Sequence, residues 1–202
     1  ASLYGTLNLS KFVKLTSKNL FIPLSVGGGI KTISQIENFL QSGADKISIN
    51  SAAINNINFV KKSSRIFGSS TIVCIIETVK IDGKYFITKE NGRDVINEDP
   101  VVWAKKLEEH GAGEIFLTSI NHEGVQKGFD LQLTRKISES VNIPVVANGG
   151  AGSFKHIYEV INYTKISGVS ISSFFHYDIC QNFNFKKPKI GNTHFLDNLK
   201  KK

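Results

Sequence analysis

A short apolar strand that runs directly into a glycine turn occurs twice in this chain. Residues 22–30 read IPLSVGGGI, and residues 143–152 read IPVVANGGAG. The segments that follow are repeated as well, because ISINS at 47–51 is echoed by VSISS at 169–173. This recurrence of strand, glycine turn, helix and second strand predicts two related halves built from the same βα units.

The two glycine turns predict anion binding. Glycine between a strand and a helix lets backbone N–H groups approach a phosphate closely, and the helix dipole adds positive potential at that point. A single turn of this kind often only closes a βα unit. Two turns at matching places, each with a small polar turn after the next strand, indicate two phosphate sites related by approximate twofold symmetry.

The order of the elements predicts a parallel α/β protein. Apolar strands alternate with amphipathic helices, and only residues 80–93 read as a β-ribbon, with turns at Asp82-Gly83 and Asn91-Gly92. The half-repeat favours a (β/α)8 TIM barrel over an open dinucleotide-binding sheet, which would need GxGxxG after its first strand. About six strands and the end of another are found. The chain therefore reads as a partial barrel that lacks the first strand and helix and most of the second strand.

Composition limits the domain organisation and the partners. A length of 202 residues with 41% hydrophobic content suits one core, so we expect a barrel over 1–178, from the end of strand 2 to strand 8. A basic tail or terminal helix is expected over 179–202, and its lysines account for much of the net charge of +8. A nucleic-acid module would need aromatic residues interleaved with these lysines, and only three phenylalanines near the tail hint at that.

Several functions are not expected. The chain has no run of eighteen apolar residues and no signal-peptide pattern, which predicts a cytoplasmic protein that binds no membrane. Cys74 and Cys180 have neither the spacing of a zinc site nor that of a disulfide. We expect no metal, no cofactor and no nucleic acid.

Polar residues end several of the predicted strands, where a barrel places its chemistry. Glu77 stands out, because a carboxylate near the end of an apolar strand is costly unless it is paired, solvated or used. We predict that Glu77 is catalytic; the alternative is an ion pair with Lys80 or with another basic residue of the ribbon. Asn121 and Glu123 follow another strand and could hydrogen-bond a hydroxylated substrate, although Glu123 could equally be a solvated loop carboxylate. The full set is Asn50, Ser51, Glu77, Thr118, Ser119, Asn121, Glu123, Asn148, Ser172 and Ser173.

A second charged set belongs to the opposite face. Asp45 and Lys46 precede or begin one strand and Glu114 begins another. Such residues can form ordinary surface salt bridges, which contribute little to stability. They can also form a partner surface or an entry into the interior of the barrel.

The chain resembles a known family over most of its length, to about residue 177. The motifs are PLSVGGGI (23–30), GADKISINSAA (43–53), WAKKLEEHGAGEIFLTSI (103–120), KGFDLQLTRKISESVNIPV (127–145) and GGAGS (149–153). They are similar to the cyclase subunit of imidazole glycerol phosphate synthase in histidine biosynthesis. The resemblance implies a (β/α)8 barrel that receives ammonia from a glutamine amidotransferase docked on its N-terminal face. It also implies a doubly phosphorylated ribulosyl-aminoimidazole substrate, which is cleaved and cyclised to imidazole glycerol phosphate and an aminoimidazole carboxamide ribotide.

The resemblance also implies roles for individual residues. Lys46 and Glu114 match the charged gate at the bottom of the barrel, and Asp45 matches an aspartate that contacts the partner. Apart from the resemblance, Thr118 and Asn121 are expected to contact the substrate, the alternative for Thr118 being that it only satisfies backbone groups inside the barrel. The two phosphate sites match Gly28, Gly29, Asn50 and Ser51 on one side and Gly124, Gly149, Gly150 and Ser173 on the other.

The sequence departs from the family in its acid–base residues. The family uses an aspartate on the first strand, which this chain does not contain, and one on the fifth strand, where this chain has Glu77. The family's DRDG loop is Asn121-His122-Glu123-Gly124 here. Two further functions therefore stay open: a paralogue that works with an amidotransferase to aminate a sugar for surface polysaccharide, and a non-catalytic barrel that only binds the amidotransferase.

Overall fold

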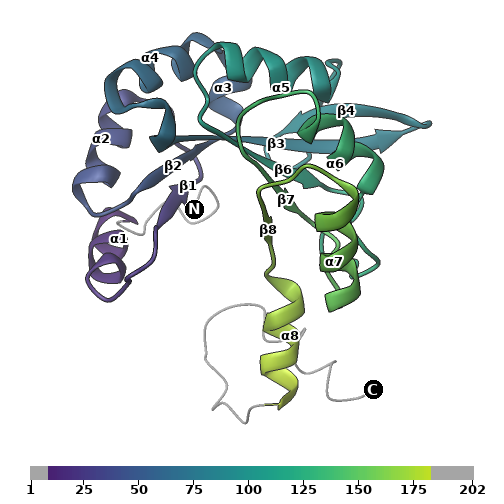
Figure 1. Cartoon of the computed structure of the whole chain (residues 1–202). Helices are drawn as coiled ribbons and strands as arrows, with labels where there is room; N and C mark the ends of the chain where they lie inside the picture. The colour runs from purple at the N-terminus through teal and green to yellow at the C-terminus, as the bar shows by residue number, and fades with distance from the viewer. Residues whose placement is uncertain (1–8, 183–202) are drawn as a thin grey trace.

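Six parallel strands form one curled sheet in the computed structural model, which describes residues 9–182 (Figure 1). Each strand pairs in parallel with the next one in the chain, apart from the inserted ribbon. The strands are β1 (Ser25–Gly27), β2 (Lys46–Ile49), β3 (Ile72–Ile81), β6 (Glu114–Ser119), β7 (Val145–Asn148) and β8 (Gly168–Ser170). Parallel neighbours in chain order are the topology of a βα barrel, so the predicted partial (β/α)8 barrel is confirmed.

The predicted ribbon is confirmed as well. Strand β3 continues beyond its partner β2 and pairs with β4 (Lys84–Lys89) in antiparallel register, and β4 pairs with β5 (Asp94–Ile96). The first turn has positive φ at Asp82 (48°) and Gly83 (78°), and the second has it at Asn91 (59°) and Gly92 (81°). Such turns follow the twist of paired antiparallel strands, which is why Asp-Gly and Asn-Gly are found there.

Helices cover the outer, convex face of the sheet, and α8 lies beyond the end of β8 (Figure 1). Their starts are capped by side chains that the sequence supplies, such as Thr32 with a complete capping box and Asp99 before Pro100. The sequence predicts one helix over 56–67, ended by Gly68. In the structure this helix begins at Asn58 and is preceded by a separate short helix, since Asn56 has an extended backbone. The helices are α1 (Leu9–Ser17), α2 (Ile33–Gln41), α3 (Ser51–Asn55), α4 (Asn58–Phe67), α5 (Pro100–Glu109), α6 (Leu131–Ser138), α7 (Phe154–Tyr163) and α8 (Ser173–Asn182), with a 3-10 turn at Ser69–Thr71.

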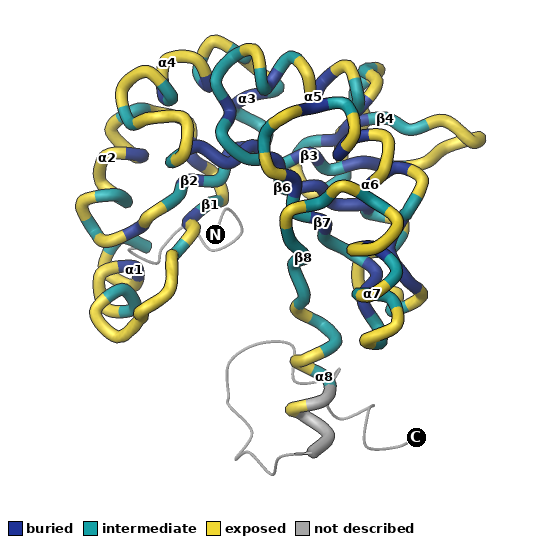
Figure 2. The backbone as a smooth tube through the Cα atoms, viewed as in Figure 1, coloured by how far each residue is buried: buried dark blue, intermediate teal, exposed yellow. Residues whose placement is uncertain are grey.

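The main core lies between the convex face of the sheet and the helices. Alternate strand residues point outward and are almost fully buried, among them Ile47, Ile115 and Leu117. They pack with helix residues such as Ile36 and Leu107 in one cluster. Figure 2 shows this burial concentrated in β2, β3, β6 and β7 and on the inner sides of the helices.

The concave face carries the other half of each strand and is less covered. The near-continuous apolar run of β3 predicts a strand buried on both faces, but its concave-facing residue Ile75 is only half-buried. The reason is that β1 and β8 end the sheet and do not pair with each other within the described residues. A closed barrel fills its interior with side chains from all of its strands, whereas this sheet leaves the concave side accessible.

The predicted boundary after residue 178 falls inside α8, and residues 183–202, with most of the predicted basic tail, lie outside the described part of the chain. The three phenylalanines considered for nucleic-acid binding lie outside it too. None of the helices between residues 9 and 182 is long and apolar enough to cross a membrane.

Candidate active site

Glu77 lies where three strands meet at the carboxyl edge of the sheet. In the register of the sheet it is opposite Thr118 on β6 and opposite Thr88 on β4. Paired residues of adjacent strands lie on the same face, so Glu77, Thr88 and Thr118 share the concave face. Glu77 has no salt bridge among the described residues. Lys80, its predicted alternative partner, instead contacts Gln132 and the Tyr85 ring.

The surroundings of Glu77 raise its pKa above the ordinary value of 4.5. Burial is the largest cause, and the negative charge of Glu123 adds to it. Hydrogen bonds from the Gly92 and Asn91 backbone and from the Asn50 side chain act in the opposite direction. Predicted site residues Glu77 and Asn50 are thus in direct contact, and burial lets the carboxyl group keep its proton to higher pH than an exposed glutamate does.

Three buried side-chain oxygens lack a hydrogen-bond partner within the described residues. They are Asn50 Oδ1, Glu77 Oε2 and Thr88 Oγ1. Two of them belong to strand positions that pair directly, and Asn50 contacts Glu77. Buried polar atoms are nearly always satisfied, so their gathering around one carboxylate makes this place a candidate binding site.

The same burial makes a prediction about stability. Because the folded state raises the pKa of Glu77, ionisation of this group opposes folding, and the loss begins as the pH rises above 4.5, the ordinary value. We expect Glu77→Gln to increase the free energy of unfolding at pH 7 and to have little effect at pH 4. Urea unfolding at the two pH values measures this, and a gain of equal size at both would contradict it.

Two hydrogen bonds fix the loop after β6 to the end of β3. Ile120 N donates to Thr78 O (2.9 Å), and Lys80 N donates to Asn121 Oδ1 (2.7 Å). Asn121, predicted to contact the substrate, therefore uses its side-chain oxygen to hold this loop. The loop carries Glu123, whose backbone N donates to Ser119 O (3.0 Å).

The second glycine turn is packed closely against the chain between β6 and α6. Gly149 (φ 91°) and Gly150 (φ 114°) follow β7, and Gly128 N donates to Gly150 O (2.8 Å). A Cβ atom on Gly150 would lie 2.0 Å from Gly128 O, so only glycine fits there. Ser153 then caps α7 by accepting a hydrogen bond from His156 N (3.3 Å).

The remaining residues predicted for the second phosphate site lie in the loops at the same carboxyl edge. Gly124 (φ 71°) is exposed in the loop after β6, and Ser173 begins α8 after β8. Below them, Thr118 accepts a hydrogen bond from the Asn148 side chain (3.1 Å). Thr118 is thus held in place by its neighbour on β7.

The first glycine turn has the same form. Gly28 (φ 103°) and Gly29 (φ 74°) are exposed after β1 and lead to α2. Ser51 opens α3, and its Oγ accepts a long hydrogen bond (3.4 Å) from Glu90 N in the turn between β4 and β5. The ribbon turn therefore reaches from Glu77 to a residue of the predicted first phosphate site.

The charged residues predicted for the opposite face lie there. Lys46 begins β2 and Glu114 begins β6, and their side chains form a salt bridge of 2.5 Å across the intervening strand β3. Both are partly exposed, so the pair contributes at most about 1 kcal/mol to stability. Asp45 Oδ2 accepts a hydrogen bond from Leu24 N (2.8 Å) and joins the start of β1 to that of β2.

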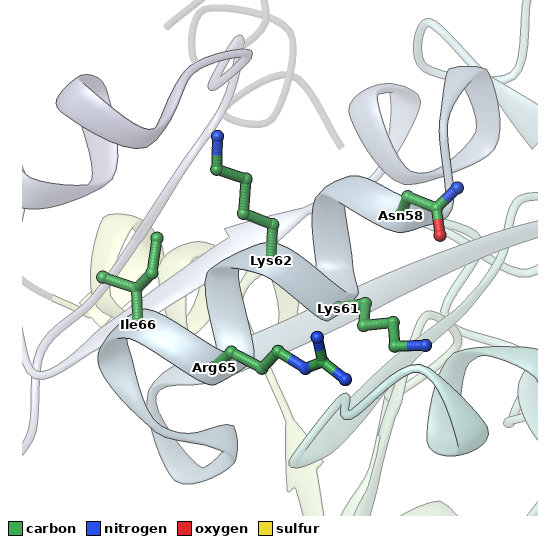
Figure 3. A pocket seen from close by; sticks show the side chains of 5 residues that line it. All are labelled: Asn58, Lys61, Lys62, Arg65 and Ile66. Atoms are coloured by element: carbon green, nitrogen blue, oxygen red, sulfur yellow. The ribbon is translucent and has the colours of Figure 1, made fainter.

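Two clefts of similar volume, among those that the described residues form, lie outside the concave face. One of about 540 Å³ lies on the outer surface of α4, where Figure 3 shows its basic side chains. The other, of about 530 Å³, lies at the N-terminal edge beside Asp45 and includes Phe21 and Ile22, which are 98% and 70% exposed. This second cleft therefore lies between the exposed apolar residues Phe21 and Ile22 and the predicted partner face at Asp45.

Sequence reasoning missed two parts of the site. The turn between β4 and β5 supplies backbone hydrogen bonds to Glu77, and Thr88 lies opposite it. The Asn-Gly pair identified the turn, but no sequence signal shows that a ribbon folds back over the strand before it. Glu123 was identified as a polar loop residue, but its closeness to Glu77 was not.

A curled parallel sheet with glycine turns and a partly buried acid at its carboxyl edge, and with a charged pair at the other edge, defines a protein of the βα-barrel class. Comparison with known proteins narrows this class. Residues 1–181 match the family described as "Histidine biosynthesis protein", and the chain belongs to that family.

Similar proteins include three subunits called "Imidazole glycerol phosphate synthase subunit HisF". The one from Saccharolobus solfataricus is 47% identical over 168 residues, which cover 83% of this chain and 67% of that protein. The one from Legionella pneumophila is 47% identical over 156 residues (77% and 74%), and that from Petrotoga mobilis is 42% identical over 187 residues (91% and 74%). The chain thus spans two thirds to three quarters of the length of these relatives.

Proposed function

We propose that the protein acts as the cyclase subunit of imidazole glycerol phosphate synthase in histidine biosynthesis, with Glu77 as its acid–base group. The names of its relatives support this reaction. The structural observation that carries the proposal is the buried carboxyl group of Glu77, whose pKa is raised, at the edge of the sheet where barrels perform chemistry.

The glycine turns would hold the two phosphates of the substrate. Gly28 and Gly29, with Asn50 and Ser51, are assigned to one phosphate through backbone N–H groups and the start of α3. The other phosphate is assigned to the turn after β7 and to the loops after β6 and β8, whose residues are Gly149, Gly150, Gly124 and Ser173. Backbone N–H groups at glycine turns and helix starts bind phosphate without any charged side chain.

Glu77 would move the protons that the reaction requires. Addition of ammonia to a carbonyl carbon leaves an excess proton on nitrogen, and the oxygen that leaves as water must gain one. A carboxyl group whose pKa is raised by burial can serve as acid in one step and as base in another. Thr118 and Asn121 frame the same edge, and their polar groups are held by hydrogen bonds to Asn148 and Lys80.

The test is turnover by the complete protein. It is mixed with a glutamine amidotransferase and glutamine, and the loss of the ribulosyl-aminoimidazole nucleotide is followed together with the formation of imidazole glycerol phosphate. Consumption of the nucleotide supports the proposal. No consumption with either glutamine or an ammonium salt overturns it in favour of the sugar-aminating paralogue or the non-catalytic barrel.

The N-terminal edge would receive the amidotransferase and its ammonia. Lys46 and Glu114 lie at the entrance to the concave face, where a paired lysine and glutamate can open and close a path. Beside them, Asp45 shares a cleft with Phe21 and Ile22. A nearly fully exposed phenylalanine next to a carboxylate fits a protein interface, which commonly combines an aromatic anchor with a polar rim.

Phe21→Ser is therefore expected to weaken binding of the amidotransferase at least tenfold, since loss of an aromatic anchor commonly costs roughly 2 kcal/mol. The fold should be unaffected, because the side chain is 98% exposed. Titration calorimetry with the amidotransferase measures the affinity. Activity with ammonium salt should persist while activity with glutamine falls.

Phe154→Ser is the matched control. Phe154 is also an exposed phenylalanine (70%), but it begins α7 on the outer face of the barrel. Its replacement should leave the affinity for the amidotransferase unchanged. Equal affinities for native protein and the Phe21 variant would remove this cleft from the interface.

A further inference from the structure

The side chain of His156 reaches back from the first turn of α7 to the second glycine turn. Its Nδ1 accepts a hydrogen bond from Gly152 N (3.2 Å), while its own backbone N donates to Ser153 Oγ (3.3 Å). A backbone N–H can only donate, so Nδ1 is the acceptor and the neutral ring carries its proton on Nε2. The bond therefore fixes the direction of the Gly152 N–H, and with it the peptide group between Ala151 and Gly152.

The first glycine turn leads into its helix in the same way, but with a different residue. Thr32 Oγ1 accepts a hydrogen bond from Gln35 N (3.2 Å), and Gln35 Oε1 accepts from Thr32 N (3.1 Å) and from Lys31 N (2.7 Å). Such reciprocal bonds satisfy N–H groups that a helix leaves unpaired at its start. In both halves the third residue of the helix supplies the acceptor, so His156 in α7 is the counterpart of Gln35 in α2.

The ring of His156 also packs on the segment before α6. A Cβ atom added to Gly128 would lie 3.7 Å from His156 Cδ2 and 3.9 Å from Nε2, so the ring lies beside that glycine. Gly128 N in turn donates to Gly150 O (2.8 Å). A Cβ on Gly152 would lie 2.2 Å from Gln126 O, so the same segment runs directly against the turn. Packing against Gly128 therefore keeps the imidazole facing the second glycine turn.

We propose that His156 is a positioning residue for the second phosphate turn: its Nδ1 holds the Gly152 N–H toward α7, so that the N–H groups of Gly149 and Gly150 keep the arrangement that binds phosphate. This inference rests on the proposed function, which assigns a phosphate to this turn. Binding through backbone N–H groups depends on the orientation of the peptides, and neighbouring hydrogen bonds hold that orientation. His156 acts through the turn and not on the reacting atoms, so its loss weakens substrate binding rather than the chemical step.

His156→Leu tests the inference, because leucine has an apolar side chain without an acceptor. The variant and the native protein are titrated with inorganic phosphate, and NMR follows the amide signals of residues 149–150 in the second turn and of residues 28–29 in the first. We expect the Kd at the second turn to rise about tenfold, since the Gly152 N–H loses its partner, and the Kd at the first turn to stay unchanged. An unchanged Kd at the second turn, an equal rise at both turns, or no response of the second turn in the native protein overturns the inference.

Two matched variants separate this role from a general effect on α7. His156→Asn places Oδ1 near the position of Nδ1, so it keeps an acceptor for Gly152 N and should recover most of the affinity. Lys155→Leu makes the leucine substitution at the neighbouring residue, whose side chain is 81% exposed, and should leave both turns unchanged. An Asn variant that binds phosphate as weakly as the Leu variant would contradict a role for the Nδ1 acceptor.

The complete protein supplies the kinetic measurement. With ammonium salt as the nitrogen source, His156→Leu should raise the KM for the nucleotide about tenfold and leave kcat nearly unchanged, the pattern expected when uniform binding is lost. A fall in kcat at unchanged KM would place His156 in the chemical step and overturn the inference. The phosphate titration needs no turnover, so failure of the proposed function is distinct: the native protein would bind phosphate at both turns without consuming the nucleotide.

Discussion

Replacement of Glu77 by glutamine is expected to lower turnover of the ribulosyl-aminoimidazole nucleotide roughly 100- to 10,000-fold, the range found when a general acid–base group is removed. Glutamine has nearly the same shape and can keep the contact with Asn50, but it cannot transfer a proton. The KM for the nucleotide should change little, because the phosphates are assigned to backbone groups elsewhere. Initial rates with ammonium salt measure the effect without the amidotransferase.

Glu77→Asp is the companion variant. Aspartate retains the carboxyl group and draws it back by over an ångström, roughly one methylene length. A displacement of that size can cost about 100-fold in rate, and here it is glutamate whose carboxyl group is displaced from the position that an aspartate gives it. The family that the chain resembles has aspartate at this strand position, so activity in the Asp variant should be preserved or raised. Full activity of the Gln variant would remove Glu77 from the chemistry. Loss in both variants would assign it a structural role.

Much of the fold was predictable because local chemistry and tertiary structure agree. Glu114 was expected to begin a strand and it begins β6, and the ribbon turns were found from Asp-Gly and Asn-Gly. The helix predicted over 56–67 was less accurate, since α3 precedes it. Asn55 ends α3 and Asn56 follows it with an extended backbone, and this polar pair gave no sign that the residues from Ser51 onward would be helical.

The candidate site was predicted less completely than the fold. Carboxyl ends of neighbouring parallel strands meet at one edge, so the contact between Asn50 and Glu77 follows from topology. The hydrogen bonds from the ribbon turn to Glu77 do not follow from topology. The direction in which a hairpin folds depends on the twist of β3 and on packing against Ile120. The interaction of Glu77 with Glu123 also depends on loop hydrogen bonds that leave no pattern in the sequence.

Gly150→Ala is expected to have the largest effect on stability among substitutions at the two glycine turns. Its Cβ would lie 2.0 Å from Gly128 O and 3.0 Å from Phe129 N, and its φ of 114° is unfavourable for any residue with a Cβ. The backbone must move, which breaks the hydrogen bond from Gly128 N to Gly150 O. We expect a loss of about 3 kcal/mol in the free energy of unfolding, measured in urea. The KM for the nucleotide should also rise, since the displaced turn is assigned to a phosphate.

Gly124→Ala separates the two causes of that loss. Gly124 also has positive φ (71°), but a Cβ there would meet no atom within 4 Å. Only the left-handed backbone opposes alanine at this position, at a cost of about 1 kcal/mol. The difference between the two variants in the free energy of unfolding therefore measures the cost of the steric contact between the second glycine turn and Gly128. Equal losses would mean that backbone conformation alone requires glycine in this turn, and that the turn does not depend on contact with the segment before α6 for its shape.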